Sequence, residues 1–175
     1  MLDLLRRIAV GVLWVLAGVG VASGLVWGAT AAGVVKPLIV VSGSMEPEIM
    51  TGDLLVATRV DTADLAVGDV VSLPSELTDA LVTHRIVSIE ESTPGRFTIA
   101  MKGDANEFGD ALDYTVGETA WQPTWQLPGM GTVVTNLTTP AVVVPLLIGL
   151  LSLLGLTLLA PAQRPAPLGQ PQVQE

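Results

Sequence analysis

The stretch Gly52-Asp53-Leu54-Leu55-Val56-Ala57-Thr58 decides the fold class of this chain of 175 residues. Gly-Asp is a turn signal, and the five residues that follow it form a short apolar run of the kind found in β-strands. The centre of the chain contains no segment with a convincing helical period. The residues on either side of this stretch are therefore interpreted as turns and strands.

Four further runs of the same kind surround it, and one of them follows a second Gly-Asp pair at residues 68–69. Turn signals that recur at intervals of about 10–15 residues between such runs are typical of an all-β, barrel-like domain. We therefore predict a mainly β domain over residues 36–139. The predicted strands are Leu38–Val41, Leu54–Thr58, Val70–Leu73, Leu81–Ile89 and Phe97–Met101.

Two long apolar segments flank this domain. Residues 8–35 contain no charged side chain, and about 20 apolar residues are enough for a helix to cross a membrane. Residues 140–161 form a second apolar stretch, in which Pro145 is expected to kink the first turns. Trp121 and Trp125 precede it and fit either a membrane-interface belt or a core. We predict a transmembrane helix in each segment, with the β domain between them.

Arg6 and Arg7 precede the first apolar segment and set the expected orientation. Because positive charge favours the cytoplasmic side, we predict that residues 1–7 are cytoplasmic and the β domain is extracytoplasmic. The chain would be a multi-pass protein of the cell membrane, ending in a disordered cytoplasmic tail at residues 162–175. The alternative for the first segment is a signal peptide cleaved after Ala29-Thr30-Ala31, although its apolar stretch exceeds the usual ~7–15 residues.

Composition excludes several classes of function. The net charge is −9, and residues 36–139 hold 15 Asp and Glu against 5 Lys and Arg. Nucleic-acid binding needs a basic surface, so no nucleic acid is expected as a partner. The chain has no Cys and a single His, so we expect neither disulfides, nor a thiolate nucleophile, nor a zinc site. No metal and no other cofactor is predicted.

The residues suited to catalysis are Ser42-Gly43-Ser44-Met45-Glu46-Pro47 and His84. Glycine permits a sharp turn and proline fixes the backbone that leaves it, so a serine hydroxyl can be held outside the hydrogen-bond ladder. An imidazole can accept a proton at neutral pH. Strand alternation places His84 on one face with Val82 and Ile86. A turn serine and a core histidine are the alternatives to catalytic roles.

Together with two later blocks, this motif resembles type I signal peptidases. Val41–Pro47 is similar to the nucleophile block. Thr83–Arg85 resembles the second block in the form of the endoplasmic-reticulum and archaeal branch, also carried by some Gram-positive bacteria. Lys102–Asn106 followed by Asp110 resembles the third block, and the order over about residues 36–135 is that of the family. The resemblance implies a membrane-bound S26 serine endopeptidase that removes signal peptides from secreted preproteins, cleaving after small residues.

The resemblance also implies roles for single residues. Ser44 would be the nucleophile and His84 its general base, and the backbone N–H of Ser44 and the hydroxyl of Ser42 would form the oxyanion hole. Asp110 would orient the imidazole. Asp104 competes for that catalytic role or has a structural one, and Asp113 lies close enough to leave the alignment open.

The implied partners are secretory preproteins, the lipid bilayer and the translocation channel. Two alternatives stay open. One is a non-catalytic, membrane-anchored β-domain scaffold, which would not need the Ser44, His84 and Asp110 constellation. The other is a Ser-Lys self-processing protease of the repressor type. Only Lys36 and Lys102 could supply its base, and neither matches the lysine block of the Ser-Lys branch.

Overall fold

The computed structural model describes residues 2–78 and 80–159. Within these residues, seven strands form one antiparallel sheet in the order β1-β2-β7-β3-β4-β5-β6. The strands are β1 Val35–Ile39, β2 Leu54–Asp61, β3 Val70–Pro74, β4 Leu81–Thr93, β5 Arg96–Lys102, β6 Tyr114–Val116 and β7 Thr119–Leu127. A single 3₁₀ turn, Thr62–Asp64, follows β2.

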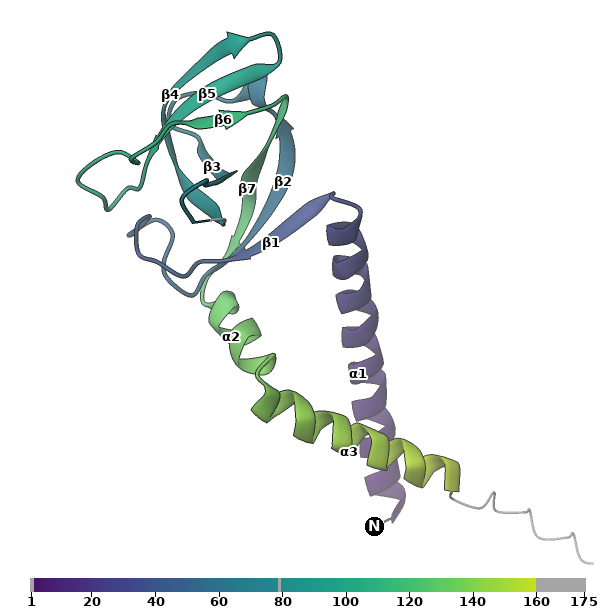
Figure 1. Ribbon diagram of the computed structural model, residues 1–175. Coiled ribbons are helices and arrows are strands. Elements are labelled where there is room, and N and C mark those ends of the chain that lie inside the picture. Colours follow the sequence, from purple (N-terminus) through teal and green to yellow (C-terminus); the bar gives the residue numbers. More distant parts are fainter. Residues whose placement is uncertain (1, 79, 160–175) are drawn as a thin grey trace, which may run out of the picture. The chain divides into compact units, whose positions relative to one another are not determined.

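The sheet curls into a half-barrel, which confirms the predicted mainly β, barrel-like domain (Figure 1). β-Bulges contribute to this curvature, because an extra residue bends its strand and increases the local twist. One bulge lies where β2 pairs with β7, since Val56 pairs with Trp125 while Ala57 pairs with Pro123. Two further register shifts interrupt the β4–β5 pairing.

Two clusters of buried apolar side chains fill the half-barrel. The larger cluster lies between β3, β4, β5, β6 and the start of β7, and the smaller joins the segment that follows β1 to β2. The larger consists of Leu65, Val71, Leu73, Ile86, Ile99, Met101, Tyr114, Val116 and Ala120. The smaller consists of Met45, Ile49 and Leu55, with Leu38, Val40 and Val70 packed against it.

All five predicted strands are present, with shifted ends. β1 ends at Ile39 because Val40 leaves the ladder: its N–H donates to the carbonyl of Asp53, and its carbonyl accepts from the N–H of Gly52. β6 and β7 were not predicted. β6 has only three residues, and β7 contains Trp121 and Pro123 in place of a β-branched run.

Three helices complete the described part: α1 Leu2–Ala31, α2 Met130–Leu137 and α3 Pro140–Leu159. One helical stretch in it, Val10–Ala31, is long and apolar enough to cross a membrane, and α2 with α3 adds a second only if the pair counts as one interrupted span. The chain divides into two compact units, residues 1–134 and 135–175, and α3 belongs to the second. The predicted tail at residues 162–175 lies outside the described residues.

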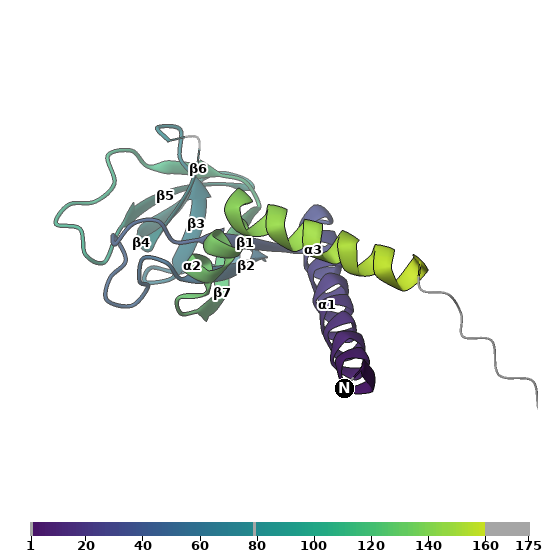
Figure 2. The same cartoon turned by 90° about the horizontal axis from the view of Figure 1, so that it is seen from below.

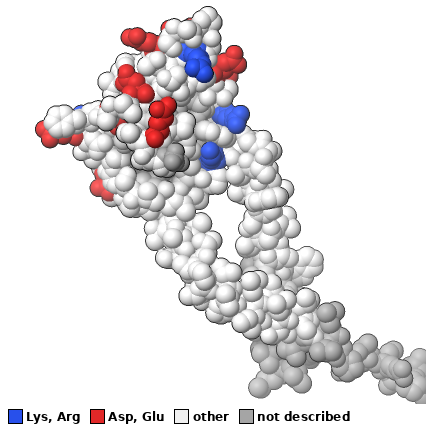
Figure 3. Space-filling model, viewed as in Figure 1, with Lys and Arg blue, Asp and Glu red and all other residues white. Residues whose placement is uncertain are grey.

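Two loops meet at one end of the sheet. The loop after β1 and the loop between β5 and β6 lie at the same end of the half-barrel in both ribbon views (Figures 1 and 2). The described backbone joins them, because Ala105 N–H donates to the carbonyl of Ser44 at 2.9 Å. Acidic side chains are spread over the β domain on the face that Figure 3 shows, in keeping with its negative charge.

Candidate active site

The first element of the site is the nucleophile loop, residues 40–53, which joins β1 to β2. A buried carboxylate fixes its far end. Asp53 accepts hydrogen bonds from Met50 N–H at 3.0 Å, Gly129 N–H at 2.8 Å and the amide of Gln126 at 2.7 Å. These donors, with Gly129 first, lower the pKa of Asp53, because they stabilise its charged form. The loop is therefore anchored to the junction of β7 and α2.

The near end of the loop is anchored by burial. Met45 and Ile49 are 2% and 5% exposed and pack on Leu55 of β2. Ile49 N–H also donates to the carbonyl of Met45 at 2.9 Å, which closes one turn of backbone. Ser44 immediately precedes this buried turn, so its backbone is held while its side chain lies at the surface of the smaller core cluster.

The second element is the acidic loop, residues 103–113, between β5 and β6. Asp110 N–H donates to the carbonyl of Met101 at 2.9 Å, and Ala105 N–H donates to that of Ser44. Gly103 makes this approach possible, because a Cβ atom at that position would lie 2.6 Å from the carbonyl oxygen of Ser44. The glycine of the Lys-Gly-Asp motif thus lets the two loops touch.

The structure brings Ser44, His84 and Asp110 together as one hydrogen-bonded chain. His84 Nε2 lies 3.0 Å from Ser44 Oγ, and Nδ1 lies 2.7 and 2.8 Å from the two carboxylate oxygens of Asp110. His84 is 8% exposed and is fixed in the sheet by pairing with Val71 of β3. A carboxylate at Nδ1 favours the tautomer with the proton there, which leaves Nε2 free to accept the serine proton.

Tyr114 extends this chain, and the sequence analysis did not identify it. Its hydroxyl donates to Asp110 Oδ2 at 2.8 Å, and the residue is 9% exposed. Burial, followed by the hydrogen bond to Asp110, raises the pKa of Tyr114 to about 12. Tyr114 belongs to none of the motifs found in the sequence, so the sequence alone does not indicate a role for it.

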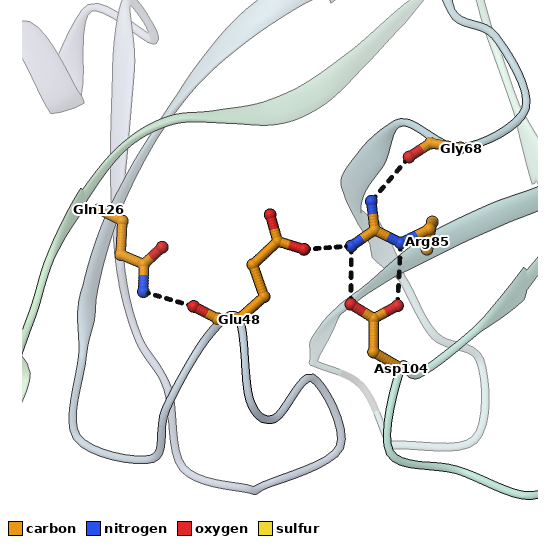
Figure 4. A network of polar contacts seen from close by, with 5 residues as sticks. All are labelled: Glu48, Gly68, Arg85, Asp104 and Gln126. Atoms are coloured by element: carbon orange, nitrogen blue, oxygen red, sulfur yellow. Dashed lines mark hydrogen bonds and ion pairs between the residues drawn. The ribbon is translucent and has the colours of Figure 1, made fainter.

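Asp104 pairs with Arg85 (Figure 4), and no hydrogen bond described for residues 2–78 and 80–159 joins it to His84. The guanidinium donates to both carboxylate oxygens, from Nε at 2.9 Å and from Nη2 at 2.6 Å. These bonds lower the pKa of Asp104. Arg85 also donates to the carbonyl of Gly68 at 2.8 Å and to the carboxylate of Glu48 at 2.5 Å. One side chain thus links the acidic loop, the turn before β3 and the nucleophile loop.

One predicted oxyanion donor, the Ser42 hydroxyl, lies beside the Ser44 hydroxyl. Ser42 Oγ is exposed and 3.3 Å from Ser44 Oγ. Within residues 2–78 and 80–159, no hydrogen bond engages the backbone N–H of Ser44. A carbonyl oxygen placed beside Ser44 Oγ could therefore receive a bond from this N–H, and Ser42 could supply a second.

The remaining candidates lie elsewhere. Lys36 Nζ lies 5.2 Å from the ring centroid of Trp121, and Lys102 pairs with Arg85 across β4 and β5. No contact described for residues 2–78 and 80–159 joins either lysine to Ser44. Asp113 is exposed and has no described contact with His84. The described residues also contain no group of three or more side chains that could hold a metal ion.

An apolar cleft of about 570 Å³ leads to Ser44. Its lining includes Val41 and Ser42 of the nucleophile loop, Leu81 and Val82 of β4, and buried side chains of the smaller core cluster. A second cleft, of about 510 Å³, opens on the side of His84 that faces Asp110 and Tyr114. The His84 ring borders both clefts.

A half-barrel that carries linked serine, histidine and aspartate side chains has the arrangement used by serine-type peptidases. The chain is 36% identical over 84 residues to the signal peptidase complex catalytic subunit SEC11C of Homo sapiens, which covers 47% of this chain and 44% of that protein. It is 37% identical over 84 residues to the catalytic subunit sec11 of Dictyostelium discoideum, covering 47% and 46%.

These homologues confirm the resemblance to the signal peptidases of the endoplasmic-reticulum branch. The alignments span about half the length of the curated relatives that the chain matches. No family model matches the chain.

Proposed function

We propose that this chain is a membrane-bound serine endopeptidase that removes N-terminal signal peptides from secreted preproteins, cleaving after small residues. The main support is the hydrogen-bonded chain Ser44–His84–Asp110. Ser44 Oγ lies 3.0 Å from His84 Nε2, and His84 Nδ1 lies 2.7 Å from Asp110 Oδ1. The names of the homologues add the class of reaction, because they are catalytic subunits of signal peptidase complexes.

The mechanism follows from the order of these groups. Neutral His84 takes the proton of Ser44 as the hydroxyl attacks the scissile carbonyl. Asp110 stabilises the imidazolium that forms, and the Ser44 N–H and the Ser42 hydroxyl bind the developing oxyanion. His84 then protonates the leaving amine, and water releases the signal peptide from the acyl-enzyme by the same steps in reverse order.

The contacts favour this Ser-His mechanism over a Ser-Lys mechanism. A lysine can serve as a base only when it is strongly desolvated and lies against the hydroxyl. Lys36 instead lies over Trp121, and Lys102 pairs in register with Arg85 on the neighbouring strand. The non-catalytic scaffold is also disfavoured, since it gives no reason for a serine, a histidine and an aspartate joined by hydrogen bonds beside a cleft.

The apolar cleft is suited to an extended peptide. Val41, which is 84% exposed, and Leu81 both line it. A strand lying between them would place its scissile carbonyl at Ser44 and its side chains against an apolar floor. Such a site would bind the end of a signal peptide through apolar contacts and main-chain hydrogen bonds.

The membrane arrangement is part of the proposal. We place α1 and the segment at residues 140–161 across the cell membrane, the β domain outside it, and the tail at residues 162–175 in the cytoplasm. The apolar stretch Val10–Ala31 supports the first span. Nine residues of extended chain from Val35 to Ser44 reach at most ~30 Å, so the nucleophile stays close to the bilayer. Preproteins would arrive there from the translocation channel.

The test is cleavage of a model preprotein by the purified full-length chain in detergent, with sequencing of the new N-terminus. We expect a cut after a small residue at the end of the signal peptide. Ser44→Ala and His84→Ala should each remove nearly all cleavage, and the double variant should be little worse than either one because the pair acts as a unit.

Lys102→Ala serves as the control for the base and should retain substantial activity. A dead but folded Lys102→Ala alongside an active His84→Ala would instead identify a Ser-Lys enzyme. Cleavage by Ser44→Ala, in a preparation free of host peptidase, would exclude the serine-peptidase proposal.

A further inference from the structure

Tyr114 is the only tyrosine of the chain, and its hydroxyl is directed at the carboxylate of the candidate site. β6 holds its backbone, since Tyr114 pairs with Ile99 of β5. Its ring belongs to the larger core cluster, where Ile99 is fully buried. The paired strands and the core therefore hold the tyrosine hydroxyl in place beside Asp110, whereas Asp110 itself lies in a loop.

The Asp110 carboxylate needs such support. The loop backbone is fixed near it by one bond, from Asp110 N–H to the carbonyl of Met101. Among the described residues, the only side chains that contact the carboxylate are His84 and Tyr114. The second cleft opens beside these groups, so water could compete for Oδ2 if the tyrosine hydroxyl were absent.

We propose that Tyr114 is a positioning residue for the peptidase reaction: its hydroxyl holds Asp110 in the orientation that accepts the Nδ1 proton of His84. The imidazole then presents its unprotonated Nε2 to Ser44 Oγ. This inference rests on the proposed function. It makes the catalytic unit a chain of four side chains, in which the tyrosine touches neither substrate nor the reacting atoms.

The chemistry of the phenol suits this role. Burial raises the pKa of Tyr114 to about 12, so the hydroxyl stays protonated and remains a donor throughout the neutral range. No proton leaves the tyrosine during the reaction. A hydrogen bond to a charged acceptor is stronger than one between neutral groups, so its loss should be measurable in turnover.

Tyr114→Phe tests the proposal, because it keeps the buried ring and removes only the hydroxyl. In the full-length protein in detergent we expect kcat for a model preprotein to fall about 10-fold to 100-fold, with KM within about twofold of the wild type. Thr115→Val is the matched control. It removes a hydroxyl from the exposed neighbouring position on β6 and should leave kcat unchanged.

His84 gives a readout that a purely structural role would not change. It is the only histidine, so in protein without a histidine tag the ¹⁵N resonances of one imidazole report the site. Wild-type protein without substrate should show predominantly the tautomer protonated at Nδ1. Tyr114→Phe should show a larger share of the tautomer protonated at Nε2, and Thr115→Val should not.

A double-variant cycle with Asp110→Asn completes the test. If Tyr114 acts through Asp110, adding Tyr114→Phe to Asp110→Asn should cost little further activity. Multiplicative losses, unchanged tautomer signals, or kcat within about twofold of wild type in Tyr114→Phe would each overturn the proposal. A wild-type protein that cleaves no preprotein would refute the proposed function, while the tautomer measurement would still decide the role of Tyr114.

Discussion

At the scale of single residues, the Ser42 hydroxyl lies where it could share an oxyanion with the Ser44 backbone N–H. It is exposed and 3.3 Å from Ser44 Oγ, so it lies beside the atom that would attack the substrate carbonyl. An oxyanion donor acts mainly in the transition state, and its loss therefore affects turnover more than substrate binding.

We predict that Ser42→Ala lowers kcat by about 10²–10³ and leaves KM almost unchanged. Steady-state cleavage of a model preprotein measures both constants. Ser88→Ala, at an exposed position of β4, is the control and should behave as wild type. If Ser42→Ala keeps near-normal turnover, Ser42 is a turn residue and a different donor must complete the oxyanion hole.

The two aspartates of the acidic loop should separate into a catalytic and a structural residue. We predict that Asp110→Asn keeps the melting temperature and loses most of the turnover, because an amide cannot stabilise the imidazolium or hold the required tautomer. Asp104→Asn should keep most of the turnover and lower the melting temperature at pH 6 by about 1–5 °C, as expected for a partly exposed ion pair. The reverse pattern would exchange the two roles.

The pH dependence of stability gives a second test of Asp104. Arg85 lowers the pKa of Asp104 in the folded chain below the ordinary value of 3.8. The contribution of the pair is therefore fully present above about pH 4 and is lost as the pH falls through the folded pKa. Melting temperatures of wild type and Asp104→Asn should converge as the pH drops from 6 towards 3, whereas exposed Asp113→Asn should follow the wild type.

At the scale of elements, the site depends on the contact between the nucleophile loop and the acidic loop. A Cβ atom at position 103 would meet the Ser44 carbonyl oxygen at 2.6 Å, and backbone atoms have little freedom to move aside. We predict that Gly103→Ala separates the loops, costs about 1–3 kcal/mol of stability and sharply reduces cleavage. Thermal melts and kcat measure the two effects.

Gly109 provides the matched control in the same loop. A Cβ atom there would lie 3.5 Å from the carbonyl oxygen of Met101, an ordinary van der Waals distance. Gly109→Ala should therefore retain both stability and activity. Equal effects of the two substitutions would mean that general stiffness of the loop matters, and not the close approach at Gly103.

The strands also show which parts of the fold could be predicted from the sequence alone. Local runs of β-branched residues predicted five strands, because such runs favour extended backbone wherever they pair. β7 was missed because Trp121, Pro123 and Trp125 read equally well as a membrane-interface segment, and its partner β2 lies about 60 residues earlier. The motifs predicted Ser44, His84 and Asp110 as a set. Tyr114 could not be predicted, since its role arises only when β6 pairs with β5.

At the scale of the whole molecule, the proposal requires the β domain and the preprotein on the same side of the membrane. Arg6 and Arg7 should hold the N-terminus in the cytoplasm, and the segment at residues 140–161 should return the chain there. We predict that a reporter fused at Ala105 is extracytoplasmic and one fused at Glu175 is cytoplasmic. A cytoplasmic reporter at Ala105 would contradict the proposed function, because signal peptides are removed outside.

The strand order has a consequence for the timing of activity during synthesis. The hairpin of β1 and β2 carries Ser44, while β4 carries His84, and the sheet joins these two parts only through β7. The complete sheet can therefore form only after the ribosome has synthesised β7, which ends at Leu127. The growing chain would emerge as an inert precursor, unable to attack itself or its neighbours. Late pairing of β7 would keep the growing chain inactive, as a removable propeptide does in other proteases.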